Sequence, residues 1–209
     1  TRCLSDWSSD VCSSDLTDVD VYGRYVEQVL GIDRYAYFNA GLLLLNCKQF
    51  RKNDLLKKFG DLLSVYNFVV TQDEDYLNLM CKDRVLHLDR KWNTEILPQF
   101  EIDPAKVAIF HYIMVSKPWH YPDCRFGEYF WKYAEKTEFY QELRESSLSY
   151  SDEEKQRDID CGNNLALLAE REIAREDNYL KTLRKKQAQD RVAVIEKIGE
   201  LEAKGKFDV

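Results

Sequence analysis

Residues 37–46 read YFNAGLLLLN, and this stretch decides how the rest of the chain is interpreted. A polar Asn-Ala-Gly step runs directly into four consecutive leucines. Short unbroken apolar runs are typical of strands covered on both faces, as in parallel or mixed sheets. We therefore predict a buried strand, with Asn39 and Ala40 at its entry, where they can face a cleft. Taken alone, the run is explained more simply by plain core packing.

The composition limits the classes of protein to consider. A chain of 209 residues suggests one domain, or a domain with an appendage. Apolar residues make up 44% of it and aromatic residues 13%, which is enough to build a core. The net charge of −7 argues against a nucleic-acid partner, because phosphate binding needs clustered positive charge. No apolar run approaches the roughly 20 residues that a membrane-spanning helix needs.

The cysteine pattern favours a reducing compartment. Six cysteines are present, and no pair has the Cys-x-x-Cys spacing of a zinc ribbon or a redox pair. Cys47 and Cys81 lie in apolar surroundings and are interpreted as packed, reduced thiols. We therefore expect a cytoplasmic protein, with peripheral attachment to a membrane as a variant of that location.

Residues 1–16 are unlike the rest of the chain. A Ser-Asp step recurs in TRCLSDWSSDVCSSDL without helical or strand periodicity. The segment resembles a translated sequencing adapter joined to a gene fragment, and the alternative is a disordered polar leader. Both interpretations leave residues 1–16 out of the fold, and the first implies that the natural protein begins well upstream.

A second informative stretch, Thr71-Gln72-Asp73-Glu74-Asp75, is followed by Asn78. As structure it predicts a capping box, with Thr71 capping a helix and Glu74 reaching back to the amide of the cap. Acidic residues in the first turn also suit the positive end of the helix dipole. As function, the start of a helix is a rigid place to mount a site, and the two interpretations can both hold.

The third stretch places a histidine at a strand end and a lysine six residues later. The short apolar run at 107–110 ends in His111-Tyr112, and Lys117-Pro118-Trp119 follows. A lone histidine at a strand end is most often structural. Imidazole nevertheless suits a divalent transition metal, and a lysine can neutralise phosphate.

Together, in this order and with these gaps, the three stretches resemble the signature of family 8 glycosyltransferases, which are retaining enzymes of the GT-A fold. The resemblance covers roughly residues 22–140, the back half of such a catalytic domain. It implies an α/β fold, namely the C-terminal half of a GT-A mixed sheet with flanking helices. It also implies an N-terminally truncated fragment, and we expect the 209-residue chain alone to be inactive.

The resemblance implies residues for the donor sugar and the reaction centre. Asn39, Ala40 and Gln72 would bind substrate, and Asp73 would hold donor-sugar hydroxyls as well as take part in catalysis. Glu74 would face the anomeric carbon, where relatives often carry glutamine. A carboxylate at this place would be a better nucleophile or ion-pair stabiliser for an oxocarbenium-like centre.

The resemblance also implies a metal and a diphosphate site. His111 would bind Mn²⁺ or another divalent cation, and Lys117 would contact the donor diphosphate. Relatives often have a glycine three residues after the histidine, and this chain has Met114. Glycine there permits close backbone approach to phosphate, so the methionine changes what is expected of the loop.

GT-A enzymes bind their metal through an Asp-x-Asp motif, and Asp18-Val19-Asp20 has that form. The motif would lie well upstream of the Asn-Ala-Gly step in the family. We instead predict a helix over residues 22–30, with Asp18 and Asp20 as acids at its N-terminus.

A change in composition near Ser146 suggests a boundary. We predict a leader at 1–16, a partial GT-A domain at 17–145 and a helical extension at 146–209. Ser151 and Glu154 form a second capping box, and helices are expected at about 152–160 and 164–203. The extension is interpreted as a solvated helical tail, or as a helix that contacts a protein partner or a membrane surface.

The intact protein is therefore expected to transfer a hexose from a UDP-sugar, with retention and with Mn²⁺, in the manner of the lipopolysaccharide galactosyltransferases and glucosyltransferases. The acceptor would be a saccharide, a lipid or a protein. The alternative is a non-catalytic module that binds sugars or, through its helices, another protein.

Overall fold

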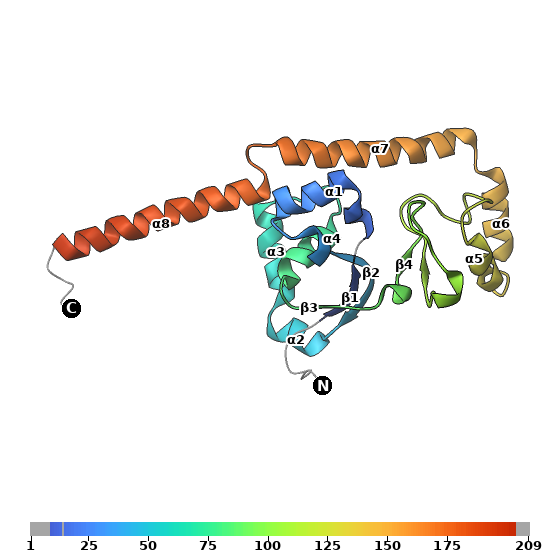
Figure 1. Cartoon of the computed structure of the whole chain (residues 1–209), viewed down its shortest axis with the longest axis horizontal. Coiled ribbons are helices and arrows are strands. Elements are labelled where there is room, and N and C mark those ends of the chain that lie inside the picture. The colour runs from blue at the N-terminus through green and yellow to red at the C-terminus, as the bar shows by residue number, and fades with distance from the viewer. Residues whose placement is uncertain (1–8, 14, 204–209) are drawn as a thin grey trace.

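The computed structural model describes residues 9–13 and 15–203 of the chain. The described part is a mixed α/β structure with two small sheets and several helices, the last of which projects away from the rest (Figure 1). The strands are β1 (Ser9–Ser13), β2 (Phe38–Leu45), β3 (Val85–His87), β4 (Thr94–Glu95) and β5 (Phe110–His111). The helices are α1 (Asp20–Tyr25), α2 (Cys47–Lys52), α3 (Leu55–Val65), α4 (Asp73–Cys81), α5 (Gly127–Ala134), α6 (Tyr140–Ser149), α7 (Asp152–Ala174) and α8 (Tyr179–Ala203).

The larger sheet has the order β2-β1-β3, with β1 antiparallel to β2 and parallel to β3. The prediction that residues 1–16 stay outside the fold is therefore wrong for residues 9–13, which form the middle strand; residues 1–8 and 14 lie outside the described part. The facing edges of β2 and β3 carry backbone donors and acceptors that need partners. A strand backbone satisfies them whatever its side chains are, which is why residues 9–13 pair despite their unpatterned sequence.

The strand predicted within residues 37–46 exists as β2, but the prediction that both its faces are buried is wrong. Phe38 is buried, and Leu43 packs against the cluster of Phe38, Leu55 and Cys81. Leu44 and Leu45, in contrast, are 62% and 38% exposed. The reason is topological, since β2 lies at the edge of its sheet and its buried contacts are concentrated in its first half.

The main core forms where α1 and the π turn that follows it (Val26–Leu30) meet α4 and α7. The predicted helix over residues 22–30 is confirmed, and its apolar stripe of Tyr22, Tyr25, Val26 and Val29 is buried. It stops at Gly31, whose φ of 72° ends the helix in the left-handed conformation. Asp20 lies in the first turn of α1, as predicted, and its carboxylate pairs with Arg24 at 2.8 Å.

The C-terminal extension is helical but divided differently from the prediction. The capping box of Ser151 and Glu154 starts α7 as predicted, yet α7 continues through Gly162 to Ala174. The break comes at 175–178, where Asn178 accepts a hydrogen bond from the amide of Lys181 at 3.0 Å and so starts α8. An interior glycine costs a helix only about 1 kcal/mol, too little to stop one that packs along its length.

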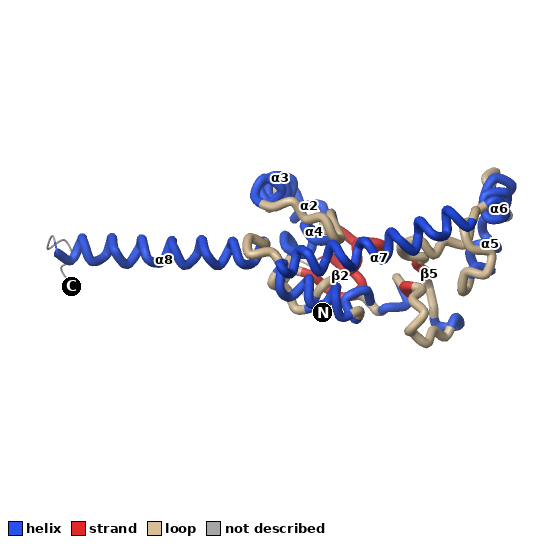
Figure 2. Tube along the Cα trace, turned by 90° about the horizontal axis from the view of Figure 1, so that it is seen from above, coloured by secondary structure: helices blue, strands red, loops and turns tan. Residues whose placement is uncertain are grey.

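The two long helices have different surroundings. Ala169 and Glu172 of α7 are buried, so this helix is part of the core and not a solvated tail. From residue 184 onward, the described side chains of α8 are exposed, and Figure 2 shows the helix extending away from the other elements. Among the described helices, none combines the length and the apolar composition that crossing a bilayer requires.

Candidate functional site

One cavity of about 370 Å³ brings together residues from opposite ends of the predicted signature. It is lined by β2, the start of α4, β5 and the loop after β5, with contributions from β4 and α7. All but one of the predicted site residues lie on its wall, namely Asn39, Ala40, Asp73, Glu74, His111 and Lys117. The exception is Gln72, an exposed residue just before α4 that does not belong to the lining. Asp18 and Asp20 also lie elsewhere.

The Asn39 side chain is held at the strand entry by two hydrogen bonds to one atom. Its Oδ1 accepts from the amide of Gly41 at 2.6 Å and from Nδ2 of Asn93 at 3.0 Å. Among the described residues, the Nδ2 group of Asn39 has no hydrogen-bond partner, so it can donate to a ligand in the cavity. Asn93, which is 3% exposed, was not among the residues that the sequence assigned to the site.

The predicted capping box at the start of α4 is wrong. Gln72, and not Thr71, is the N-cap residue, and no side chain caps the helix. The Thr71 hydroxyl instead donates to Asp75 at 2.6 Å, and Glu74 turns toward β2. Local capping rules give way here to contacts with distant parts of the chain, a departure that is common at functional sites.

Glu74 connects α4 to the entry of β2. Its Oε2 accepts a hydrogen bond from the amide of Ala40 at 3.0 Å. Withdrawal from water raises its pKa to about 7, and the nearby carboxylates of Asp75 and Asp73 act in the same direction, against the lowering effect of the Ala40 amide. At neutral pH, Glu74 is therefore divided between its protonated and ionised forms, which suits a group that exchanges a proton or meets a developing positive charge.

Asp75 is buried and fixes the start of α4. Its carboxylate accepts hydrogen bonds from the hydroxyls of Tyr25 at 2.8 Å, Tyr37 at 3.0 Å and Thr71 at 2.6 Å. Burial raises the pKa of Asp75, and these three hydroxyls oppose that effect. The network joins α1, the residue before β2 and the loop before α4, and so it sets where Asp73 and Glu74 stand.

The side chain of Asn78 also aligns α4 with β2. Its side-chain amide accepts from the Phe38 amide and donates to the Phe38 carbonyl, both at 2.9 Å, as a neighbouring strand would. It also donates to the Glu74 carbonyl at 2.9 Å. Asn78 is 2% exposed, so its hydrogen bonds to β2 and α4 are shielded from water and fix the position of one element against the other.

His111 packs against the glycine of the first motif. A Cβ atom at Gly41 would lie 2.3 Å from Cε1 and 2.7 Å from Nδ1 of His111, so a larger residue at position 41 would force the imidazole to move. Nδ1 is buried and has no hydrogen-bond partner within the described structure. Burial lowers the pKa of His111, as does the charge of Lys117, and the neutral ring carries the lone pair that a metal needs.

The residues whose placement is described contain no group of three or more His, Cys, Asp or Glu side chains that could hold a metal ion. His111 therefore fits the part of one imidazole ligand, and the described side chains do not complete a metal site around it.

The loop after β5 carries Lys117 to the cavity wall. The Lys117 ammonium group donates a hydrogen bond to the carbonyl of Tyr112, and burial lowers its pKa. Met114, on the same wall, has a φ of 51°, in the left-handed region that favours glycine. Glycine would adopt this backbone conformation without strain. Position 114 is thus suited to the glycine that relatives often carry there, although this chain has methionine.

Glu95 is a further carboxylate of the cavity that the sequence did not reveal. It is fully buried, and its strand pairs with that of His111 in parallel register. An isolated glutamate between threonine and isoleucine carries no pattern that marks it as part of a site.

Comparisons with known proteins show which family the chain resembles. Residues 24–123 match the family model described as glycosyl transferase family 8. The lipopolysaccharide 1,3-galactosyltransferase of Salmonella typhimurium is 32% identical over 94 residues, which cover 40% of this chain and 28% of that protein. A lipopolysaccharide 1,2-glucosyltransferase of Escherichia coli is 32% identical over 99 residues, or 41% of this chain and 29% of that protein. The chain spans less than half the length of these curated relatives.

Solved structures support the same assignment. The galactosyltransferase LgtC, solved with donor and acceptor sugar analogues, superimposes with a TM-score of 0.52 at 26% identity, covering 66% of this chain and 56% of LgtC. The bifunctional glycosyltransferase WbbM, at 19% identity and a TM-score of 0.59, shares the fold over 68% of this chain and 30% of its own. Residues 24–123 are therefore similar to glycosyl transferase family 8, and the fold resembles part of the GT-A fold.

Proposed function

We propose that the cavity is the donor-sugar side of a hexosyltransferase site that uses a UDP-hexose and transfers the sugar with retention of configuration. One observation carries the proposal. Residues assigned to donor sugar, reaction centre, metal and diphosphate from motifs up to 78 positions apart, Asn39 to Lys117, line the same cavity of about 370 Å³.

The sugar would lie between β2 and the start of α4. Asn39 offers an amide donor and Asp73 a carboxylate acceptor, the two kinds of group that fix the orientation of sugar hydroxyls. Glu74 lines the same cavity and accepts a hydrogen bond from the Ala40 amide. In its ionised form it would stabilise positive charge that develops at the anomeric carbon as the bond to the leaving group breaks.

The leaving diphosphate would lie toward the loop after β5. Lys117 would neutralise part of the charge that this group gains, and its hydrogen bond to Tyr112 keeps the ammonium at the wall of the cavity. A divalent cation, with Mn²⁺ proposed from the family, would be held in part by the imidazole of His111 and would supply further charge neutralisation. Met114, whose backbone is left-handed, lines the same cavity.

For the acceptor we propose a saccharide, and the relatives named for lipopolysaccharide synthesis suggest one that is linked to a lipid. Such an acceptor would place the protein at the cytoplasmic face of a membrane.

Calorimetric titration of the 209-residue chain with UDP-galactose and UDP-glucose in the presence of Mn²⁺ tests the proposal. We expect binding that weakens about tenfold in Lys117→Ala, the loss typical of a hydrogen bond to a charged group. His111→Ala should abolish the dependence on Mn²⁺. Lys106→Ala, which removes an exposed lysine outside the cavity, is the matched control and should bind as the wild type does. Binding that neither cavity variant affects would refute the proposal.

A further inference from the structure

The helix α7 connects the two halves of the candidate site. Residues Asn39, Asp73 and Glu74 stand on β2 and α4, whereas His111 and Lys117 stand on β5 and its loop. Figure 1 shows α7 running from α6 at one end to the neighbourhood of α1 at the other, across both groups of elements. Its contacts at the two ends are of different kinds.

The N-terminal end of α7 is attached to the loop that carries Lys117. Oδ2 of Asp158 accepts hydrogen bonds from the hydroxyls of Tyr121 and Tyr150, each at 2.8 Å. The backbone amide of Tyr121 in turn donates to the carbonyl of Lys117 at 2.9 Å. One residue therefore separates Asp158 from the backbone of Lys117.

A ring contact strengthens this attachment. The His120 imidazole stacks on the Tyr150 ring, with centroids 4.2 Å apart and an interplanar angle of 4°. The amide of His120 also donates to the Lys117 carbonyl at 2.9 Å. The two residues His120 and Tyr121 of the turn after Lys117 are therefore both held in place, His120 by the Tyr150 ring and Tyr121 by the Asp158 carboxylate.

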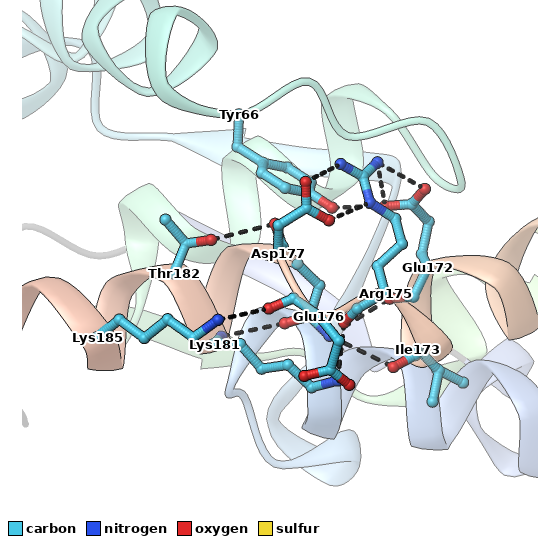
Figure 3. Close-up of polar contacts among 10 residues, drawn as sticks. Tyr66, Glu172, Ile173, Arg175, Glu176, Asp177, Lys181, Thr182 and Lys185 are labelled. Carbon is cyan, nitrogen blue, oxygen red and sulfur yellow. Dashed lines mark hydrogen bonds and ion pairs between the residues drawn. The ribbon is translucent and has the colours of Figure 1, made fainter.

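The C-terminal end of α7 is attached to the other half of the molecule. The Tyr66 hydroxyl donates to Glu172 at 2.5 Å, and Arg175 pairs with the same carboxylate at 3.2 Å (Figure 3). Glu172 is 1% exposed, and Arg24 of α1 pairs with Glu170 at 2.6 Å. This end is therefore fixed to α1 and to the residue that ends α3.

Between these attachments the helix borders the cavity itself. Leu165, about midway between Asp158 and Glu172, lines the same cavity as Glu74 and Lys117. Glu172 follows Asp158 by 14 positions along the helix, which corresponds to about 21 Å at 1.5 Å per residue. A continuous helix of this length has little freedom to stretch. It therefore holds the elements attached near Asp158 and near Glu172 at a fixed distance from each other.

We propose that α7 is a strap that sets the distance between the sugar-binding residues and Lys117, and that Asp158 is a positioning residue that acts on Lys117 through Tyr121. The part of this inference that concerns diphosphate binding rests on the proposed function. The part that concerns the attachment of the loop does not.

Two measurements on one set of variants test the proposal. The variants are Asp158→Ala and Tyr121→Phe, with Asp160→Ala as the control, because Asp160 is an exposed residue of the same helix that bonds only within it, to Gln156. Hydrogen exchange by mass spectrometry reports the opening of residues 115–124 and, separately, of residues 37–45 and 73–81. Titration with inorganic pyrophosphate reports the position of Lys117.

We expect exchange in residues 115–124 to rise about tenfold in Asp158→Ala, the change that loss of a hydrogen bond to a charged group produces, with residues 37–45 and 73–81 unchanged. Tyr121→Phe should reproduce this result, and it keeps the ring if the alanine variant fails to fold. Pyrophosphate affinity should fall by a similar factor, and Lys117→Ala should add nothing to that loss in the double variant.

Unchanged exchange in residues 115–124, or a rise shared equally by residues 37–45, would overturn the proposal. So would additive losses of pyrophosphate affinity in the double variant. If the wild-type chain does not bind pyrophosphate, the proposed diphosphate site fails, and the exchange measurement alone then decides whether α7 holds the loop.

Discussion

Replacing Glu74 by glutamine should stabilise the protein, and by an amount that depends on pH. The carboxylate is withdrawn from water beside two other acids, and its pKa rises from 4.5 to about 7 on folding. Glutamine has nearly the same shape and keeps an oxygen that can accept the Ala40 amide, but it carries no charge to desolvate. The substitution therefore isolates the cost of the ionised side chain.

The sign of this pH dependence follows from the linkage between proton binding and folding. A carboxyl group whose pKa is raised by folding contributes its full stability below pH 4.5 and loses it progressively as the pH rises to about 7. At about 1.4 kcal/mol per pH unit, the loss amounts to about 3 kcal/mol above pH 7. Glu74→Gln should thus match the wild type near pH 4 and exceed it by about 3 kcal/mol at pH 8.5, or by roughly 6 to 12 °C in Tm.

Urea unfolding followed by tryptophan fluorescence at pH 4, 5.5, 7 and 8.5 measures this difference. Glu145→Gln, on the exposed face of α6, is the control and should leave the free energy of unfolding unchanged at every pH. A gain for Glu74→Gln that is the same at all four pH values, or a loss above pH 7, would refute the burial argument. A carboxylate that destabilises the folded state is expected at a functional site, where function is favoured over stability.

Three other predictions concern the frame around the site. Gly41→Ala should displace the His111 ring, because the new Cβ would lie 2.3 Å from Cε1, and the imidazole ¹H–¹⁵N spectrum should shift while the signals of α8 do not. Asn78→Ala should cost roughly 2 to 5 kcal/mol in urea unfolding, since the amide and carbonyl of Phe38 each lose a buried partner; a cost below about 1 kcal/mol would show that β2 does not depend on this clamp. Met114→Gly should raise the free energy of unfolding by about 0.5 to 1 kcal/mol by relieving the left-handed backbone, and a loss of stability would contradict that reasoning.

Periodicity and spacing in the sequence predicted the structural features that depend on neighbouring residues. The stripe from Tyr22 to Val29, the capping box at Ser151 and the strand before Leu45 are set by neighbours in the sequence, and the structure contains all three. The order and spacing of the motifs also predicted a single cavity, because motif residues that serve one site must meet in space wherever the chain carries them.

Contacts between distant residues could not be predicted in this way. Thr71 has the sequence of a helix cap, yet its hydroxyl is taken by Asp75 in a network with Tyr25 and Tyr37. The exposure of Leu44 depends on the strand order, which a leucine run does not encode. Glu95 gave no signal, because its place in the cavity depends on the pairing of β4 with β5.

The most direct test of the account follows the backbone amides of the ¹⁵N-labelled chain by NMR during titration with UDP-galactose and Mg²⁺, and then adds traces of Mn²⁺. We expect the signals of residues 39–41, 73–74 and 111–117 to shift together with one dissociation constant, and Mn²⁺ to broaden those around His111 first. Shifts confined to one of these three segments, or broadening centred elsewhere on the molecule, would contradict the claim that they form one site.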